Sequence, residues 1–300
     1  MHALLFVIVV VLMMSAAAPA FAQVKAADPG AGAELRKATS FYASFDEAVR
    51  GDFGGGGLTL NTRFNHAAEP GAFVFENGFD EKVFRIAPNK GVQGGALEVV
   101  DVLPRNGRVF FPVKGNLAVK NDGWSGAVSV WCKTDPNSLI KATFCDPVQI
   151  THKGANNGGI WFDFNNAKPR DLRHGAFPAI PEGAKGLGED DPQAPMVRVP
   201  ANDWKQSDWH HVVLNWKNFD TGKDDAMSAL WIDGKLIGEV KGRTLAMGWD
   251  VDKAGVYVAV NYIGLLDELA LFSRALTPEE IRLLHTQPGI LAPLKTSPSR

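Results

Sequence analysis

The stretch LLDELALFSRALTPEEIRLL, residues 265–284, joins a strand pattern to a helix pattern. Thr277 can cap a helix, Pro278 suits the first helical position, and Glu280 lies three residues after the cap, which is the signature of a capping box. An apolar side for this helix then comes from Ile281, Leu283 and Leu284. We therefore expect a short C-terminal helix that closes a β-structure by packing on it.

Most of the remaining chain consists of short segments that alternate apolar and polar residues between turn signals, which is typical of an all-β protein. Asp233-Gly234 predicts a hairpin with a two-residue type I′ turn. The segment 167–202 is rich in Pro, Gly and charge, and its length predicts a functional or mobile loop. Strands are expected at residues 95–100, 108–112, 127–133, 147–152, 159–165, 210–217, 228–232, 236–240, 255–260 and 265–272.

Five motifs, in order along the chain, resemble LamG-like domains of the concanavalin A-like lectin/glucanase superfamily. They are SFYASFDE (40–47), SGAVSVWCK (125–133), DWHHVVLNW (208–216), ALWIDGKLIG (229–238) and YIGLLDELALFSRALTPEEI (262–281). The resemblance spans about residues 41–285, nearly the whole of the expected mature chain. It implies a two-sheet antiparallel jelly-roll sandwich. It implies much less about function, because the superfamily includes binding modules, adhesion modules, hydrolases and lyases.

The start of the chain has the features of a secretory signal. An apolar run at residues 4–14 is followed by Ala20-Phe21-Ala22, a small-residue cleavage pattern. We expect a signal peptide at 1–22, a leader or linker at 23–39, the LamG-like domain at 40–287 and a flexible tail at 288–300. The protein would then be secreted or periplasmic, with no membrane span in the mature chain. The alternative is an uncleaved membrane anchor, although the apolar run is shorter than the ~20 residues that span a bilayer.

Charge and cysteine content limit the partners and the kinds of site that the protein can have. The 31 basic and 33 acidic side chains give a formal charge of -2, which argues against nucleic acid as a partner because such proteins need a basic face. Two cysteines are too few for a zinc site. In an exported protein they predict a Cys132–Cys145 disulfide, and the alternative is two separately buried thiols.

Strand alternation places three tryptophans on the faces opposite the aliphatic residues of their strands. An aromatic ring beside hydrogen-bonding groups suits the apolar C–H face and the hydroxyls of a sugar. The alternative is that loops, especially 167–202, cover these side chains. The candidate ligand-binding residues on these strands are Trp131, Trp161, Asp163, Asn165, His211, Asn215 and Trp231.

A basic segment follows the strand that carries Trp161. Arg170 and Arg173, with Lys168 and His174 beside them, would suit the carboxylate of an acidic glycan, since arginine binds carboxylates in bidentate fashion. The alternative is a solvated loop in which Asp171 balances one arginine.

The resemblance also implies a structural calcium ion where the first and last strands meet, at positions that correspond to Asp46 and Asp267. Two carboxylates would need backbone carbonyls and water to complete the six to eight ligands of calcium. The alternative is that both carboxylates hydrogen-bond backbone groups and hold the chain ends together.

Catalytic signatures are absent from the strands. Laminarinase-type hydrolases of the superfamily carry an E-x-D-x-x-E motif, and this motif does not occur here. Lyase-like members carry Gln-x-His on one strand, whereas Gln149 and His152 are three residues apart and fall on opposite faces. We therefore expect an exported, non-catalytic module that binds a glycan or another cell-surface ligand. Two alternatives remain: a glycoside hydrolase or polysaccharide lyase with loop-borne catalytic residues, and a protein-interaction domain.

Overall fold

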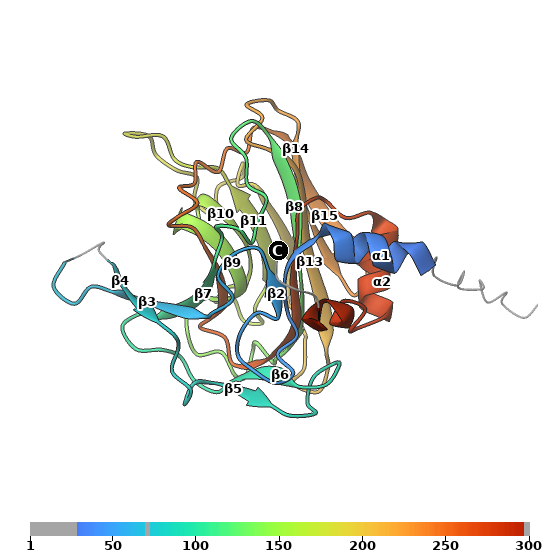
Figure 1. Cartoon of the computed structure of the whole chain (residues 1–300). Helices are drawn as coiled ribbons and strands as arrows, with labels where there is room; N and C mark the ends of the chain where they lie inside the picture. Colours follow the sequence, from blue (N-terminus) through green and yellow to red (C-terminus); the bar gives the residue numbers. More distant parts are fainter. Residues whose placement is uncertain (1–28, 70–72, 297–300) are drawn as a thin grey trace, which may run out of the picture.

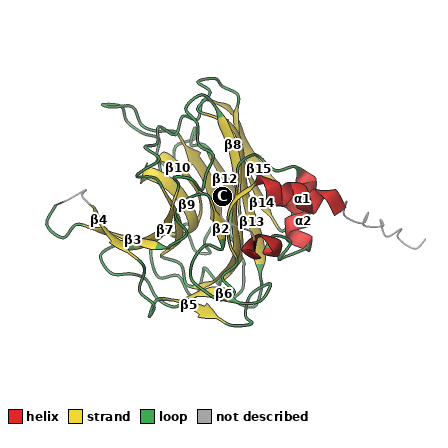
Figure 2. Cartoon of the chain, viewed as in Figure 1, coloured by secondary structure: helices red, strands yellow, loops and turns green. Residues whose placement is uncertain are grey.

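The computed structural model describes residues 29–69 and 73–296, which fold into two antiparallel sheets with short helices (Figures 1 and 2). Sheet 1 contains, in spatial order, β15 (Lys235–Arg243), β14 (Ala226–Ile232), β13 (His210–Phe219), β8 (Trp124–Lys133), β17 (Gly264–Phe272), β1 (Thr39–Ala43) and β2 (Phe53–Gly54), with β6 (Ala96–Val99) pairing to β17 and β5 (Phe84–Ala87) to β6. Sheet 2 contains β12 (Met196–Val199), β11 (Leu172–Phe177), β10 (Asn157–Phe164), β9 (Cys145–Gly154), β16 (Gly255–Val260), β7 (Arg108–Pro112), β3 (Asn61–Asn65) and β4 (Phe73–Asn77).

The core lies between the two sheets and follows the predicted alternation. Val128, Leu214 and Leu230 of sheet 1 face Ile160 and Phe162 of sheet 2 in one buried cluster. All ten expected segments form strands. The sequence-based prediction of an all-β, two-sheet sandwich with a C-terminal helix is therefore confirmed.

Helices cover the outer face of sheet 1, the face turned away from sheet 2 (Figure 1). They are α1 (Pro29–Ala38), α2 (Pro278–Thr286) and the short 3-10 helix η1 (Ala292–Thr296). The predicted capping box is present: the Glu280 N–H donates to Thr277 Oγ1 at 3.2 Å, and the Thr277 N–H donates to Glu280 Oε2 at 2.9 Å. A second apolar cluster, which includes Tyr42 and Val213 of the sheet and Ile281 and Leu284 of α2, fills the space beneath the helices.

Three segments differ from the pattern expected from the sequence. The expected long loop 167–202 contains β11 and β12, which extend sheet 2. The expected leader 23–39 includes α1, and residues 288–296 of the expected flexible tail pack through Leu291 and Leu294, both buried. The predicted signal peptide, 1–22, lies outside the described residues. Among the described helices, none has the length and apolarity needed to cross a membrane.

The prediction of a disulfide between Cys132 and Cys145 is wrong, since the structure contains two free thiols. Cys132 lies on β8 of sheet 1 and Cys145 on β9 of sheet 2, and each side chain fills part of the core between the sheets. Burial raises the pKa of both thiols, which keeps them in the unreactive protonated form.

Thiol titration should therefore give different results for the native and the unfolded protein. In the native state we expect no reaction on the timescale of minutes, because both side chains are 0% exposed. In denaturant without reductant, two thiols per chain should react. Zero reactive thiols after unfolding would instead show that a disulfide had formed.

Candidate ligand-binding site

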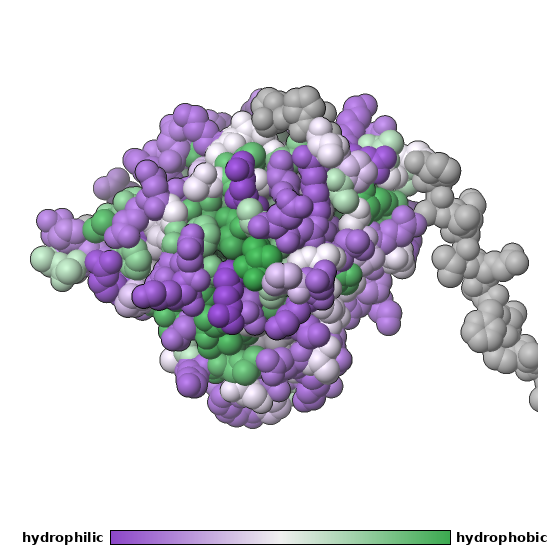
Figure 3. Space-filling view, turned by 60° about the horizontal axis from the view of Figure 1, so that its bottom comes forward, coloured by the Kyte–Doolittle hydropathy of each residue, from purple (hydrophilic) through white to green (hydrophobic). Residues whose placement is uncertain are grey.

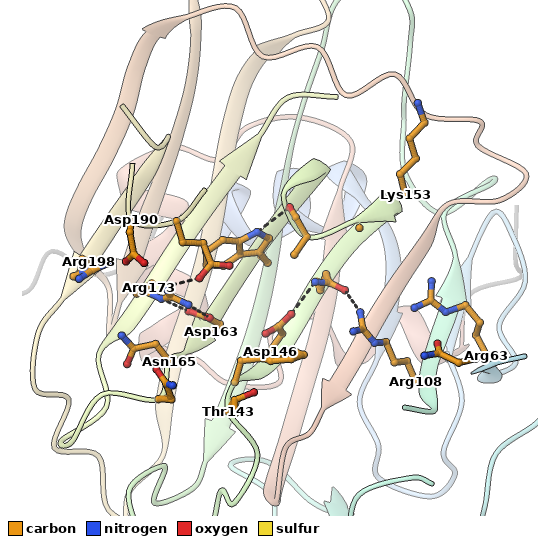
Figure 4. A pocket seen from close by; sticks show the side chains of 18 of the residues that line it. Arg63, Arg108, Thr143, Asp146, Lys153, Asp163, Asn165, Arg173, Asp190 and Arg198 are labelled. Carbon is orange, nitrogen blue, oxygen red and sulfur yellow. Dashed lines mark hydrogen bonds and ion pairs between the residues drawn. The ribbon is translucent and has the colours of Figure 1, made fainter. Parts of the chain in front are cut away.

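The site is a cavity of about 520 Å³ on the outer face of sheet 2. Strands β3, β4, β7, β9, β10, β11 and β12 contribute lining residues, as do the loops on either side of β9, after β10 and before β12 (Figure 4). Its lining is strongly charged, with both signs present. The charged residues are Arg63, Arg108, Lys153, Arg173, Arg198, Asp146, Asp163, Glu189 and Asp190.

Trp161 lines this cavity but presents little of its ring to solvent. Its side chain is 1% exposed, stacks on Phe177 with ring centroids 5.8 Å apart, and donates from Nε1 to the Ala155 carbonyl at 3.0 Å. The ring lies against the backbone of β11, where a Cβ at Gly175 would be 2.4 Å from it. Trp161 is therefore a packed part of the cavity wall and not an open stacking platform.

Asp163 and Arg173 lie opposite each other on β10 and β11 and form a buried ion pair. Arg173 Nε donates to Asp163 Oδ1 at 2.9 Å, and Arg173 Nη1 lies 2.7 Å from Glu189 Oε2. Burial raises the pKa of the Asp163 carboxyl to about 6, although the Arg173 guanidinium opposes the shift. Because two carboxylates surround Arg173, its charge is already neutralised within the protein.

A second polar chain runs across the floor of the cavity. Arg108 Nη1 donates to Gln149 Oε1 at 3.0 Å, and Gln149 Nε2 donates to Asp146 Oδ2 at 2.8 Å (Figure 4). Burial, and then the negative charge of Asp163, raise the pKa of Asp146 well above its usual range. The cavity therefore contains two neighbouring carboxyl groups that differ in their partners.

Asn165 also lines the cavity, whereas Arg170 does not. Arg170 is 2% exposed and donates through Nη2 to the carbonyls of Ile140 at 2.8 Å and Ala142 at 2.7 Å. Its guanidinium connects two loops. Of the two arginines predicted to hold an acidic glycan, one is structural and the other is paired within the protein.

The other four predicted residues lie on sheet 1, beneath α2. Trp131 stacks on His285 of α2 with ring centroids 5.4 Å apart, and Trp231 packs in the cluster under the helices. Both rings are less than 10% exposed. The prediction that these two tryptophans bind a ligand is therefore wrong; they are covered, as in the alternative, but by α2 and not by loop 167–202.

The polar residues predicted on sheet 1, His211 and Asn215, form hydrogen bonds within the protein. His211 shares a 2.8 Å hydrogen bond with Ser129 Oγ, and burial lowers its pKa to about 3. Asn215 exchanges two hydrogen bonds with the backbone of Leu276, at 3.0 and 2.9 Å, and so fixes the approach to α2. The structure thus groups Trp161, Asp163, Asn165 and Arg173 in one cavity and separates them from Trp131, His211, Asn215 and Trp231.

Asp46 and Asp267, where the resemblance implies calcium, hold the loop before β6. Asp267 Oδ2 accepts a hydrogen bond from the Val92 N–H at 2.7 Å, and Asp46 Oδ1 accepts one from the Gly95 N–H at 2.7 Å. The second oxygen of Asp46 pairs with the ammonium of Lys295. A metal ion beside Asp46 would have to displace this ammonium. The carboxylate oxygens face backbone N–H groups and an ammonium, so this arrangement fits the hydrogen-bonding alternative better than a calcium site.

A chelator should therefore leave the melting temperature unchanged. Asp267→Ala should lower it, because the buried Glu268 N–H, which donates to Asp267 Oδ1 at 2.9 Å, would lose its acceptor at a cost of about 1–3 kcal/mol. Melting curves with EDTA, with added calcium and for the variant check both outcomes. A fall with EDTA that calcium reverses would identify a bound ion, since ligands of the folded state stabilise by mass action.

Most of the lining residues were not among the predicted ligand-binding residues, and Arg63, Arg108, Asp146 and Gln149 are examples. Arg63 in NTRFN and Arg108 in RVFFP each alternate with apolar neighbours, which marks the outward face of a strand. That signal was present, but nothing in the sequence shows that β3 and β7 lie beside each other.

A second cavity, of about 690 Å³, lies beside β6 and β17 and is lined partly by Val99, Leu139, Trp209 and Leu265. Seen from below, the molecule presents an apolar area bordered by hydrophilic residues (Figure 3). Its charged lining residues are Lys90, Glu98 and Lys133. This cavity lacks the clustered carboxylates and guanidinium groups of the first one, which is the better candidate for binding a polar ligand.

Comparison with known proteins identifies the family. Residues 106–282 match the model of a family described as the concanavalin A-like lectin/glucanases superfamily. A search of curated proteins finds no match. Among solved structures, the receptor-binding domain of botulinum neurotoxin C/D mosaic serotype is similar at a TM-score of 0.51 and 13% identity, and the alignment covers 84% of this chain and 52% of that one.

A smaller solved domain is aligned over nearly its whole length. Domain 4 of the extracellular arabinanase AbnA from Geobacillus stearothermophilus, solved in complex with arabinotriose, has a TM-score of 0.47 and 16% identity, over 82% of this chain and 98% of that one. The family match covers more than half of the chain, from the loop before β7 to α2. The chain belongs to the concanavalin A-like lectin/glucanase superfamily.

Proposed function

We propose that the protein is a glycan-binding module that uses the cavity on the outer face of sheet 2. The observation that carries the proposal is the convergence of carboxyl, amide and guanidinium groups in one hollow, which the exposed ring of Phe73 also lines. A sugar offers hydroxyls that such groups can bind, and apolar C–H faces that aromatic side chains can contact. The outer face of sheet 1 is covered by helices, so sheet 2 offers the open face.

Binding to a glycan array, followed by titration calorimetry with the best ligand, tests the proposal. Asp146→Asn should weaken binding about threefold to tenfold, because one hydrogen bond that does not involve a charge contributes about 0.5–1.5 kcal/mol. Asp101→Asn, an exposed position outside the cavity, is the matched control. Equal affinity of Asp146→Asn and wild type would move the site elsewhere on the molecule.

The second candidate function is catalysis in the same cavity, and the carboxyl groups of Asp146 and Asp163 favour it. Both have raised pKa values, and neighbouring carboxyls with raised pKa are a common feature of acid catalysts. Incubation of the array's best ligand with wild type and with Asp146→Asn distinguishes the candidates. New reducing ends or unsaturated products from the wild type alone would establish catalysis.

We also propose that the chain is exported, on the basis of the apolar run and cleavage pattern in residues 1–22. Amino-terminal sequencing of the protein from its native host tests this. A mature chain that begins at Gln23 supports export, and an intact Met1 in the cytoplasm contradicts it.

A further inference from the structure

Two arginines face each other directly on neighbouring strands at one end of the cavity. Arg63 of β3 and Arg108 of β7 are register partners in the antiparallel pair. Both side chains line the cavity (Figure 4). Like charges at directly opposite positions of a sheet destabilise the pair of strands, so this arrangement works against the stability of the protein.

Neither arginine has a carboxylate partner. Across residues 29–69 and 73–296, no ion pair within 4.0 Å involves Arg63 or Arg108. At the other end of the cavity, by contrast, Arg173 contacts both Asp163 and Glu189. The two ends of the cavity therefore differ in charge: Arg173 is paired with carboxylates, whereas the positive charges of Arg63 and Arg108, on β3 and β7, are not.

Arg63 is buried, with a side chain that is held firmly but incompletely satisfied. It is 6% exposed, its guanidinium lies 4.0 Å from the centroid of the Phe73 ring, and its Nη1 donates to the Tyr257 hydroxyl at 3.2 Å. Its Nε is buried without any hydrogen-bond partner. Burial lowers the pKa of Arg63, and the charge of Arg108 acts in the same direction.

An arginine carries five N–H donors and keeps its proton in proteins. The hydrogen bonds of Arg63 and Arg108 go to neutral acceptors, one on Tyr257 and one on Gln149. A buried charge with unused donors and no counter-ion is costly. An anion that binds between the two guanidinium groups would satisfy the donors and remove the repulsion.

We infer that Arg63 and Arg108 form an anion subsite that takes the carboxylate or sulfate group of an acidic sugar. The inference rests on the proposed function and names the ligand class. With the anionic group on the arginines, the hydroxyls of the sugar lie toward Asp146 and Gln149, which can accept and donate hydrogen bonds. Phe73, 40% exposed at the rim, offers an aromatic edge on the same side.

The test is an array that carries neutral glycans, glycans with uronic or sialic acid, and sulfated glycans. The wild type should bind acidic glycans and not their neutral counterparts. Arg108→Gln and Arg63→Gln should each weaken that binding at least about tenfold, as expected from the loss of one charge-assisted hydrogen bond. Arg85→Gln, the same change of charge at an exposed position outside the cavity, should leave it unchanged.

Thermal melting shows whether each variant folds. Arg63 is buried, so Arg63→Gln can fail to fold. Arg108 is only half-buried, so Arg108→Gln should fold and still tests the subsite. Preference for carboxylated over sulfated glycans, or the reverse, identifies which anion the subsite takes. Binding of neutral glycans alone would overturn the anion subsite and leave the proposed function standing. Binding of no glycan would overturn both, and acidic-glycan binding that survives Arg108→Gln would overturn the subsite.

Discussion

Trp161→Ala should lower the free energy of unfolding by about 3–5 kcal/mol, as aromatic-to-alanine changes in packed positions do. The ring is 1% exposed, and the contact with Phe177 and the hydrogen bond to Ala155 disappear with it. Urea unfolding followed by circular dichroism measures the loss. The variant should also lose ligand affinity, because the wall of the cavity collapses.

Two further variants separate packing from ligand contact at this position. Trp161→Phe should lose less stability than Trp161→Ala, since it keeps an aromatic ring in the space. Gly175→Ala should destabilise in the same direction, because its new Cβ would lie 2.4 Å from the ring and displace it. A Trp161→Ala protein as stable as wild type would show that the ring is an exposed binding surface after all.

Arg173→Met should cost about 3–5 kcal/mol at pH 8, because it leaves the buried carboxylate of Asp163 without its counter-ion. Burial already raises the pKa of Asp163 to about 6, and removal of the guanidinium that opposes this shift raises the pKa further. A carboxyl whose folded-state pKa lies above its unfolded value contributes stability at low pH and loses it as pH rises through the folded value. The deficit of the variant should therefore be smaller at pH 5 than at pH 8.

The double variant Asp163→Leu/Arg173→Met is the control. Replacement of both partners by apolar groups removes the uncompensated charge, so most of the lost stability should return. Unfolding curves at pH 5 and pH 8 for wild type, single and double variants complete the comparison. An equal loss at both pH values in Arg173→Met would mean that packing of the arginine stem, and not its charge, determines the effect.

The sequence was sufficient to predict the fold because its signals are local. The alternation of Ile160, Phe162 and Phe164 with Trp161 and Asp163 assigned the inner and outer faces of β10 correctly. The capping box was readable because it depends on spacing within one turn. The family motifs then supplied the two-sheet arrangement.

The site was only partly predictable, because its residues come together through strand order. Outward direction alone could not distinguish the open face of sheet 2 from the face of sheet 1 that α2 covers, so Trp131 and Trp231 were grouped with Trp161. β11 was missed since its sequence, LRHGAF, lies in a segment rich in Pro, Gly and charge. Arg63 and Arg108 meet only when β3 pairs with β7.

The position of β1 has a consequence for the way the chain reaches its final structure. β1 pairs with β17, and the Tyr42 hydroxyl donates to Glu268, 226 residues later in the chain. Sheet 1 cannot be completed until the residues of β17 have left the ribosome. Loop closure over such a distance precedes any gain from the contact, and topologies dominated by distant pairings fold slowly. Until β17 has been synthesised, β1 therefore lacks its partner on that side, and the apolar face that the pair buries stays uncovered.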